Sequence, residues 1–184
     1  MITFPKISIT GDLGSGKSAV SRLLQQETGF EIFSTGKIQR EIAARRSMTT
    51  LELNKYAETH PEIDEEIDNF SKSLGKRDVS VIVDSRMAWF FIPNSFKIYL
   101  QVEPEEAARR ILGDNNRQSE AYQDLNTAKA KIMARKQSEN ARFLQLYGVD
   151  CGDMTNFDLV ADTTEKTPEQ VLGLILTEFK LWCT

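Results

Sequence analysis

The chain has few residues that could form disulfides or a zinc site, because its 184 residues include only two cysteines and one histidine. Cys151 and Cys183 lack the close spacing of metal-binding cysteines, so we expect reduced thiols rather than a disulfide framework or a zinc centre. His60 lies in the run T-H-P-E, directly before a proline, where a helix end or a surface position is favoured over catalysis.

The sequence also lacks the features of a membrane or secreted protein. It contains no apolar run of about 18 residues, which is the length that a spanning helix needs. Its first residues, M-I-T-F-P-K, do not form a basic segment followed by a long apolar stretch. These absences predict a cytoplasmic protein without a membrane partner.

An excess of positive charge is missing as well. The formal net charge is −4, which argues against nucleic acid as a partner, because such binding usually requires a basic face. The remaining composition, 40% hydrophobic and 27% charged, is ordinary for a globular protein. We expect one domain over residues 1–184 and a monomer, with a dimer as the alternative.

A phosphate-binding loop is the strongest motif in the chain. Residues Gly11 to Ser18 read G-D-L-G-S-G-K-S, which fits the pattern G-x-x-x-x-G-K-[ST]. In such a loop, backbone N–H groups and a helix N-terminus surround a phosphate, the lysine reaches the outer phosphates, and the hydroxyl faces Mg²⁺. The alternative is a glycine turn, which the Lys17-Ser18 pair and the flanking patterns disfavour. The residues predicted to contact ATP here are Gly11, Asp12, Leu13, Gly14, Ser15, Gly16, Lys17, Ser18 and Ala19, and Lys17 is also predicted to be catalytic.

Apolar runs bounded by turn residues predict five strands. These are Thr3–Thr10, Phe30–Ser34, Val79–Asp84, Phe96–Val102 and Leu159–Ala161. Helical patterns separate them, so we predict the α/β class: a P-loop NTPase-type, three-layer α/β/α fold around a five-stranded parallel sheet.

Helical patterns fill the segments between and after the predicted strands. The first helix runs from the loop to about Gln26, and two or three short helices fill Gly36 to Leu74, with breaks near Ser47 and His60-Pro61. Another spans Glu103 to Gly113, a long one covers Ser119 to Leu146, and the last begins at Thr167.

Polar residues follow two of the predicted strands. Asp84 ends the third strand, where it could orient Mg²⁺ opposite the Ser18 hydroxyl, although a turn-forming aspartate is the alternative. Arg86 comes next, and Arg40 follows the second strand. Because the carboxyl ends of parallel strands border one crevice, we predict that both arginines bind an acceptor phosphate there. A solvated helix position for Arg40 and a surface turn for Arg86 are the alternatives.

Arginines on the long predicted helix form a second group. Arg135 and Arg142 differ by about 20° around the helix and by about 10 Å along it, so they share a face. Glu139 lies between them, and a surface ladder of ion pairs would explain the same spacing. Three more arginines follow the fourth strand: Arg109, Arg110 and Arg117. Together they favour a phosphate clamp, so Arg135 and Arg142 are predicted to be catalytic and Arg109 to bind ATP.

Several runs together resemble the cytidylate kinase family, most closely its archaeal type. Beside the phosphate loop they are T-G-K-I-Q-R at 35–40, N-K-Y-A-E-T-H-P-E-I-D-E-E-I-D at 54–68, V-D-S-R at 83–86, R-K-Q-S-E-N-A-R-F at 135–143, L-Y-G-V-D at 146–150 and F-D-L-V-A-D-T at 157–163. Unrelated phosphate-loop proteins share only the phosphate loop and none of these other runs.

The resemblance implies transfer of the γ-phosphoryl group of ATP to CMP or dCMP with Mg²⁺, on a nucleoside monophosphate kinase fold. Small-molecule nucleotides would then be the only partners. Thr35 and Gly36 would bind the monophosphate near its base or sugar, together with Arg40 and Arg86, and Arg86 would also be catalytic. The core would comprise residues 1–35 and 76–184, the monophosphate-binding helical insertion about 36–75, and a short lid about 113–118.

The chain departs from that family at the end of the third strand. Related cytidylate kinases commonly carry Gly-Arg there, often followed by Asp, whereas this chain has Ser85-Arg86-Met87. The choice among CMP, dCMP and UMP is therefore left open. Another small-molecule kinase with AMP, UMP or dephospho-coenzyme A as acceptor is the nearest alternative, and a non-catalytic ATP-binding module is the other. The sequence has no D-x-x-G run, so a GTPase switch lacks an expected element.

Overall fold

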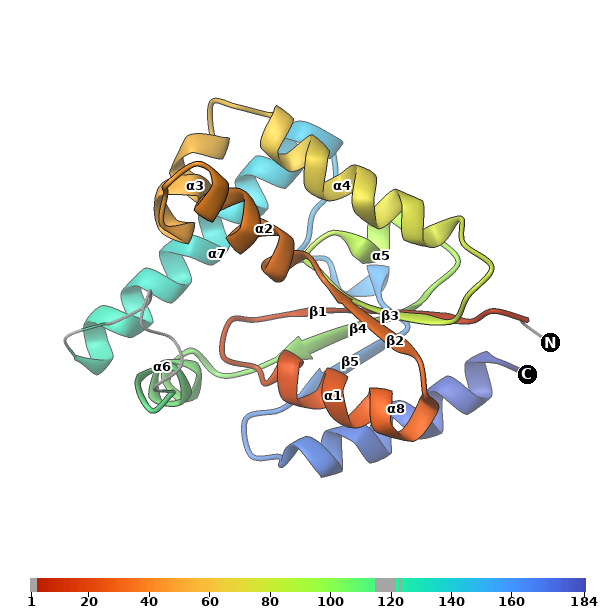
Figure 1. Cartoon of the computed structure of the whole chain (residues 1–184). Coiled ribbons are helices and arrows are strands. Elements are labelled where there is room, and N and C mark those ends of the chain that lie inside the picture. Colours follow the sequence, from red (N-terminus) through yellow and green to blue (C-terminus); the bar gives the residue numbers. More distant parts are fainter. Residues whose placement is uncertain (1–2, 115–121, 123) are drawn as a thin grey trace.

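Five parallel strands form one sheet in the order β2-β3-β1-β4-β5, seen edge-on in Figure 1. The computed structural model describes residues 3–114, 122 and 124–184. The elements follow in chain order: β1 Lys6–Gly11, α1 Lys17–Thr28, β2 Glu31–Ser34, α2 Thr35–Arg45, α3 Thr50–Ala57, α4 Glu62–Gly75, β3 Val81–Asp84, α5 Ala88–Phe91, β4 Phe96–Gln101, α6 Pro104–Leu112, α7 Leu125–Tyr147, η2 Met154–Asn156, β5 Leu159–Asp162 and α8 Pro168–Trp182.

The central strand β1 sets the position of the crevice. It pairs with β3 on one side and β4 on the other, all in parallel register. The chain therefore changes direction across the sheet at β1, and ligands of open α/β sheets bind at the carboxyl ends of the strands at such a point. The predicted five-stranded parallel sheet is confirmed.

Helices cover both faces of this sheet. In Figure 1, α1 and α8 lie below it, and α2 to α5 with α7 lie above it. All six residues of β1 are buried, as expected for a strand covered on both sides. On α8, Val171, Ile175 and Phe179 recur every four residues, so they share one face and pack into the main core with Ile7 and Ile98.

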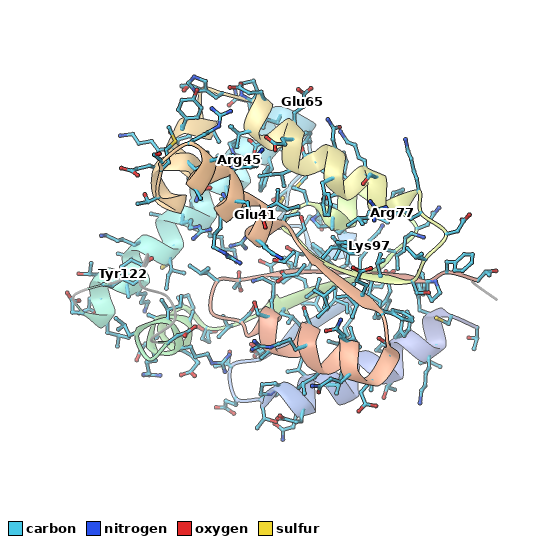
Figure 2. The ribbon with its side chains drawn as sticks, viewed as in Figure 1. Glu41, Arg45, Glu65, Arg77, Lys97 and Tyr122 are labelled. Atoms are coloured by element: carbon cyan, nitrogen blue, oxygen red, sulfur yellow. The ribbon has the colours of Figure 1, made fainter. Side chains whose placement is uncertain are left out.

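The helices between β2 and β3 have well-defined ends. Thr49 caps α3 in a reciprocal capping box with Glu52. Ser47, with φ of 55°, stops α2 before it, and Pro61 precedes α4, so the predicted breaks are confirmed. Charged side chains such as Arg45 and Glu65 lie on the exposed side of these helices, as Figure 2 shows.

The structure differs from the sequence predictions in some details. β1 begins at Lys6 rather than Thr3, and β3 begins at Val81 rather than Val79. The aromatic run after β3 forms a short helix, α5, that was not predicted. The long helix α7 is described from Leu125, and positions 115–118 of the predicted lid, with Arg117, lie outside the described residues. None of the helices within the described ranges has the length and apolar character needed to cross a bilayer.

Gly11 is predicted to be essential for the fold, since β1 and β4 approach closely there. Its φ is 142°, and an added Cβ would lie 2.2 Å from the carbonyl oxygen of Leu100. Gly11→Ala should therefore lower the free energy of unfolding by about 3 kcal/mol or more, which corresponds to a melting temperature lower by roughly 6–12 °C, as measured by thermal unfolding. Gly173→Ala on α8 is the matched control, because no atom lies within 4 Å of its added Cβ. It should leave the melting temperature equal or higher. Equal losses in both variants would contradict the prediction.

A second prediction concerns the contact between α4 and α7, where the Tyr147 hydroxyl donates a hydrogen bond to the buried Asp68. Burial raises the pKa of Asp68 to about 6. The folded state therefore holds this proton more tightly than the unfolded state, and its stability falls as the pH rises from about 4 through 6.

Asp68→Asn can still accept the tyrosine hydrogen bond and carries no charge. The variant should be more stable than wild type at pH 8, by at most about 3 kcal/mol, and the difference should vanish near pH 4. Chemical denaturation at both pH values measures this. The exposed Asp78→Asn is the control and should match wild type at each pH. A pH-independent effect of Asp68→Asn would refute the assignment.

Candidate active site

The phosphate-loop segment joins the end of β1 to the start of α1. Gly16 is the N-cap residue of α1, with φ of 84°, a conformation that glycine adopts without strain. Within α1 and its cap, no side chain caps the helix and no acidic residue occupies the first turn. The first N–H groups of the helix and its positive end therefore face the crevice ready for an anion, which fits a nucleotide phosphate. Ser18 and Ala19 belong to this first turn.

Lys17 folds back onto the loop that precedes it. Its ammonium donates hydrogen bonds to the carbonyl oxygens of Gly11, at 2.9 Å, and of Asp12, at 2.7 Å. The cation thus lies at the carboxyl end of β1, next to the loop that would surround a phosphate.

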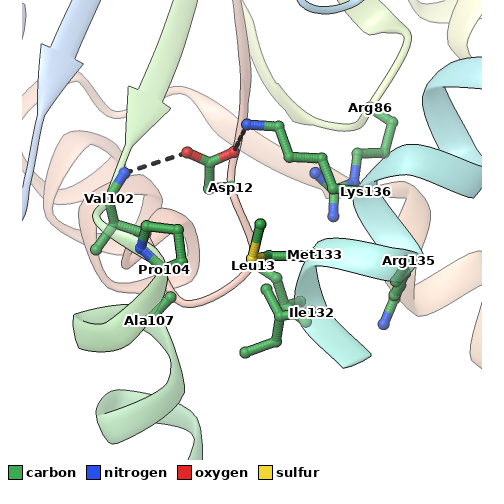
Figure 3. A pocket seen from close by; sticks show the side chains of 10 residues that line it. All are labelled: Asp12, Leu13, Arg86, Val102, Pro104, Ala107, Ile132, Met133, Arg135 and Lys136. Carbon is green, nitrogen blue, oxygen red and sulfur yellow. Dashed lines mark hydrogen bonds and ion pairs between the residues drawn. The ribbon is translucent and has the colours of Figure 1, made fainter. Parts of the chain in front are cut away.

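The side chain of Asp12 fastens the loop to its surroundings. Its carboxylate accepts hydrogen bonds from the Tyr99 hydroxyl (2.9 Å), the Val102 N–H (3.2 Å) and the Lys136 ammonium (2.6 Å), two of which appear in Figure 3. The pKa of Tyr99 is raised, mainly by burial and further by the negative charge of Asp12, so the hydroxyl keeps its proton and stays a donor. The sequence motif marks Asp12 only as a variable loop position and contains no signal for this tether.

A small cavity of about 50 Å³ adjoins the loop (Figure 3). Leu13 and Ile132 contribute apolar walls, and the charged groups at its border include Arg86 and Arg135. The structure therefore brings together two of the predicted catalytic arginines beside the phosphate loop.

Asp84 shows that cations from distant segments converge on the crevice. It lies at the end of β3, level with Ile9 of β1 and Ser34 of β2. Burial raises the pKa of this carboxyl, and the charges of Lys17, Arg86 and Arg40 oppose that rise, so all three are within electrostatic reach.

The predicted acceptor residues on α2 border the same strand end. The Thr35 hydroxyl donates to the backbone oxygen of Asp84 at 3.4 Å. An added Cβ on Gly36 would lie 3.5 Å from the Arg40 guanidinium, so this arginine lies against the first turn of α2. The predicted set Thr35, Gly36 and Arg40 is thus adjacent to Asp84.

Glu139 links two arginines in the crevice. One of its carboxylate oxygens pairs with Arg86 Nε at 3.1 Å and the other with Arg135 Nε at 2.8 Å. Arg86 also donates to the Gly11 carbonyl oxygen at 2.6 Å. Burial alone would raise the pKa of Glu139, yet Arg86 and Arg135 together lower it, so the carboxylate is ionised. The four-residue spacing from Arg135 was the only sequence signal for this role.

Arg142 has different partners from those its spacing suggested. It pairs with Asp64 of α4, with 3.3 Å between Nε and Oδ2, and donates to the carbonyl oxygen of Asn54 of α3 at 3.3 Å. Arg142 therefore contacts the helices between β2 and β3, whereas Arg135 lines the cavity beside the phosphate loop.

The two arginines of α6 also differ. Arg109, predicted to bind ATP, pairs with Glu105 and Glu106 of its own helix on the exposed surface. Its neighbour Arg110 donates to the carbonyl oxygen of Gly14 in the phosphate loop at 3.4 Å and to that of Thr163 at 2.7 Å. Arg110 is thus the α6 arginine that touches the loop.

The donors around β1 fit a magnesium ion bound together with a nucleotide. Within the described ranges, no group of three or more His, Cys, Asp or Glu side chains is arranged to hold a metal. Mg²⁺ characteristically keeps several waters and binds through one or two carboxylates plus substrate phosphates. The exposed Ser18 hydroxyl and the Asp84 carboxylate flank the loop and match that ligand set.

Comparisons with known proteins agree with this arrangement. A family model described as an AAA domain matches residues 7–135. A cytidylate kinase from Pyrobaculum aerophilum is 35% identical, with 92% of this chain and 90% of the relative covered. One from Thermoplasma volcanium is 34% identical, over 93% and 89%. An S-adenosylmethionine-dependent nucleotide dehydratase from Lacinutrix mariniflava is 32% identical over 95% of this chain but only 36% of its own length.

Solved structures share the fold at low sequence identity. The shikimate kinase of Bacteroides thetaiotaomicron has a TM-score of 0.67 at 16% identity and covers 96% of this chain and 98% of its own. That of Acinetobacter baumannii, in complex with shikimate, has a TM-score of 0.63, over 97% and 94%. These likenesses show the P-loop kinase fold, and the sequence relatives show the family. The chain belongs to the cytidylate kinase family and is a nucleoside monophosphate kinase.

Proposed function

We propose that this kinase transfers the γ-phosphoryl group of ATP to CMP or dCMP, which yields ADP and CDP or dCDP. The observation that carries the proposal is that Lys17 and Arg86 both donate to the carbonyl oxygen of Gly11, at the carboxyl end of the central strands, where the charge of Arg40 also acts on Asp84. The names of the cytidylate kinase relatives support the same acceptor.

The donor nucleotide would bind at the phosphate loop. Backbone N–H groups of the loop and of the first turn of α1 would hold the phosphates, and Lys17 would move from its carbonyl partners to the outer phosphates. Ser18 and Asp84 would hold Mg²⁺, which neutralises charge on the β- and γ-phosphates when bound. Arg110, which reaches both the loop and Thr163, is a further candidate for the donor side, beside the predicted Arg109.

The acceptor would bind between α2 and the end of β3. Arg40 and Arg86 would hold its phosphate through planar, charge-assisted hydrogen bonds, and Thr35 with Gly36 would border its base or sugar. In this proposal, helices α2 to α4, about residues 36–75, form the monophosphate-binding insertion in a core of 1–35 and 76–184. Residues of about 113–118 serve as the lid.

The chemistry requires alignment rather than a base. An oxygen of the acceptor phosphate is already ionised at neutral pH, so it can attack the γ-phosphorus directly. One P–O bond forms to the acceptor as the bond to the β-phosphate oxygen breaks, and ADP leaves. Arg86 and Arg135, which Glu139 holds beside the loop, would stabilise the charge of the transferring group.

Two other functions stay as alternatives: a kinase of the same fold with AMP, UMP or dephospho-coenzyme A as acceptor, and an ATP-binding module without turnover. The proposal includes a monomer in the cytoplasm that binds small-molecule nucleotides and neither nucleic acid nor membrane.

Lys17→Ala should abolish turnover and leave the fold intact. Because the Lys17 ammonium is proposed to bind the outer phosphates, its loss should reduce kcat by about 10³-fold or more. That factor corresponds to about 4 kcal/mol of transition-state stabilisation. A coupled assay for ADP with CMP as acceptor measures this, and circular dichroism checks the fold. The exposed Lys180→Ala on α8 is the control for removal of one positive charge. Near-wild-type turnover by Lys17→Ala would refute the assignment.

A panel of acceptors should separate the three functions. With ATP and Mg²⁺, the wild-type protein should consume CMP and dCMP with the highest kcat/KM. Preferential use of AMP, UMP or dephospho-coenzyme A would establish a different kinase. Binding of ATP without consumption in the presence of any of these acceptors would establish the module.

A further inference from the structure

A carboxylate lies within the loop that would surround the phosphates of the donor. Asp12 is the second residue of the phosphate loop, and its side chain is only 12% exposed. A negative charge at this place would repel a triphosphate, which calls for an explanation. Its partners supply one: besides the Tyr99 hydroxyl and the Val102 N–H, the carboxylate accepts a hydrogen bond from the Lys136 ammonium at 2.6 Å.

These three partners come from two different parts of the fold. Tyr99 lies in β4 and Val102 directly follows it, and β4 is a neighbour of β1 in the sheet. Their bonds hold the carboxylate at the end of the sheet. Lys136 instead belongs to α7, 124 residues further along the chain than Asp12. The Asp12–Lys136 contact therefore fastens α7 to the phosphate loop, as Figure 3 shows.

A second attachment of α7 lies three residues beyond Lys136, or about 4.5 Å along the helix axis. There Glu139 pairs with Arg86, which donates to the carbonyl oxygen of Gly11 at 2.6 Å. Gly11 and Asp12 are consecutive, so two points of the helix are held to two adjacent residues of the loop. One contact alone would let the helix pivot on the loop, whereas two contacts fix its orientation.

Arg135 depends on both attachments. Its Nε atom pairs with Glu139 at 2.8 Å, and its backbone is adjacent to that of Lys136. It lines the cavity of about 50 Å³ beside the phosphate loop, together with Asp12 and Lys136. In the proposed function this arginine stabilises the transferring phosphoryl group, and a displacement of about 1 Å can reduce such a contribution by about 10²-fold. The Lys136 contact would thus affect the rate of transfer although Lys136 itself binds protein.

We propose that Lys136 is a positioning residue of this kinase: by binding Asp12, it holds α7 so that Arg135 lies beside the phosphate loop during transfer. The side chain of Asp12 serves as the attachment point for α7, while its backbone belongs to the nucleotide-binding loop. This inference rests on the proposed function, from which it takes the role of Arg135.

The test is Lys136→Met, which removes the charge and keeps an unbranched side chain. With ATP and CMP, kcat should fall about tenfold, and the KM for each nucleotide should stay within about twofold of wild type, because Arg135 acts on the transition state. Lys136→Arg can still bind Asp12 and should keep kcat within about twofold of wild type. Lys131→Met, at an exposed position of the same helix, is the matched control and should leave kcat unchanged.

The expected loss is kinetic rather than structural. The Lys136 side chain is 45% exposed, and an ion pair at such a position adds little to stability. The melting temperature of Lys136→Met should therefore stay near that of wild type, and the same measurement verifies that every assayed variant is folded. Lys136→Gln takes the place of Lys136→Met if the latter does not fold.

Double variants identify the residues through which Lys136 acts. With Asp12→Asn in place, Lys136→Met should change kcat by less than about twofold, because the charge that holds Lys136 is already removed. The same should hold with Arg135→Ala in place, or Arg135→Lys if the alanine variant does not fold, because the guanidinium to be positioned is gone. A lysine that bound a nucleotide phosphate directly would show its full loss in both backgrounds.

The inference is overturned if folded Lys136→Met keeps the wild-type kcat, or if its loss is undiminished in either background. A rise in the KM for ATP alone also overturns it, since Lys136 would then only offset the charge of Asp12. If Arg135→Ala keeps the wild-type kcat, the role that the proposed function gives Arg135 fails, and the inference fails with it.

Failure of the proposed acceptor is visible before any variant is made. If wild type uses another acceptor in place of CMP and dCMP, only the proposed acceptor is refuted, and the same variants are assayed with the acceptor that is used. If wild type turns over no acceptor, the proposed function and the inference both fail. These outcomes differ from a wild-type kcat in Lys136→Met, which refutes the inference alone.

Discussion

The buried carboxylate of Glu139 holds the cationic side of the crevice together. Arg86 comes from the end of β3 and Arg135 from α7, and two guanidinium groups so close together would repel one another without an anion between them. Glu139 offers one oxygen to each, and the loss of one member of such a buried group typically costs about 3–5 kcal/mol. Since Arg86 also bonds to Gly11, this carboxylate connects α7 to the phosphate loop, in addition to the pair of Lys136 with Asp12.

Helix α7 extends this constraint across the molecule. Its side chains contact the phosphate loop through Lys136 and Asp12, β3 through Glu139 and Arg86, and α4 through Tyr147 and Asp68. One rigid helix thus touches both the proposed donor site and the helices proposed to bind the acceptor.

The parts of the site that local sequence determines could be predicted, and those that depend on packing could not. The phosphate loop and the strand ends at Asp84 and Arg86 are set by glycine conformation, apolar runs and the rule that parallel strands end at one edge. The two partners of Glu139 could not be predicted. Helical spacing places Arg135 and Arg142 about equally near it, yet only Arg135 pairs with it, and Arg86 is brought there by the tertiary fold. Likewise, Arg109 and Arg110 are adjacent on α6, and which one faces the loop depends on how the helix is rotated against it.

The resemblance to shikimate kinases limits what the fold alone can explain. A TM-score of 0.67 at 16% identity means that the sheet and loop support more than one acceptor, so the choice must come from the side chains that line the crevice. A hydroxyl acceptor has to lose a proton, whereas a phosphate acceptor is an anion that cations must hold beside a second anion, the triphosphate. Among the side chains described here, the five cations at this place outnumber the three carboxylates, the cations being Lys17, Arg40, Arg86, Arg135 and Lys136 and the carboxylates Asp12, Asp84 and Glu139. That surplus of positive charge, in a chain whose net charge is −4, suits two phosphorylated ligands at once.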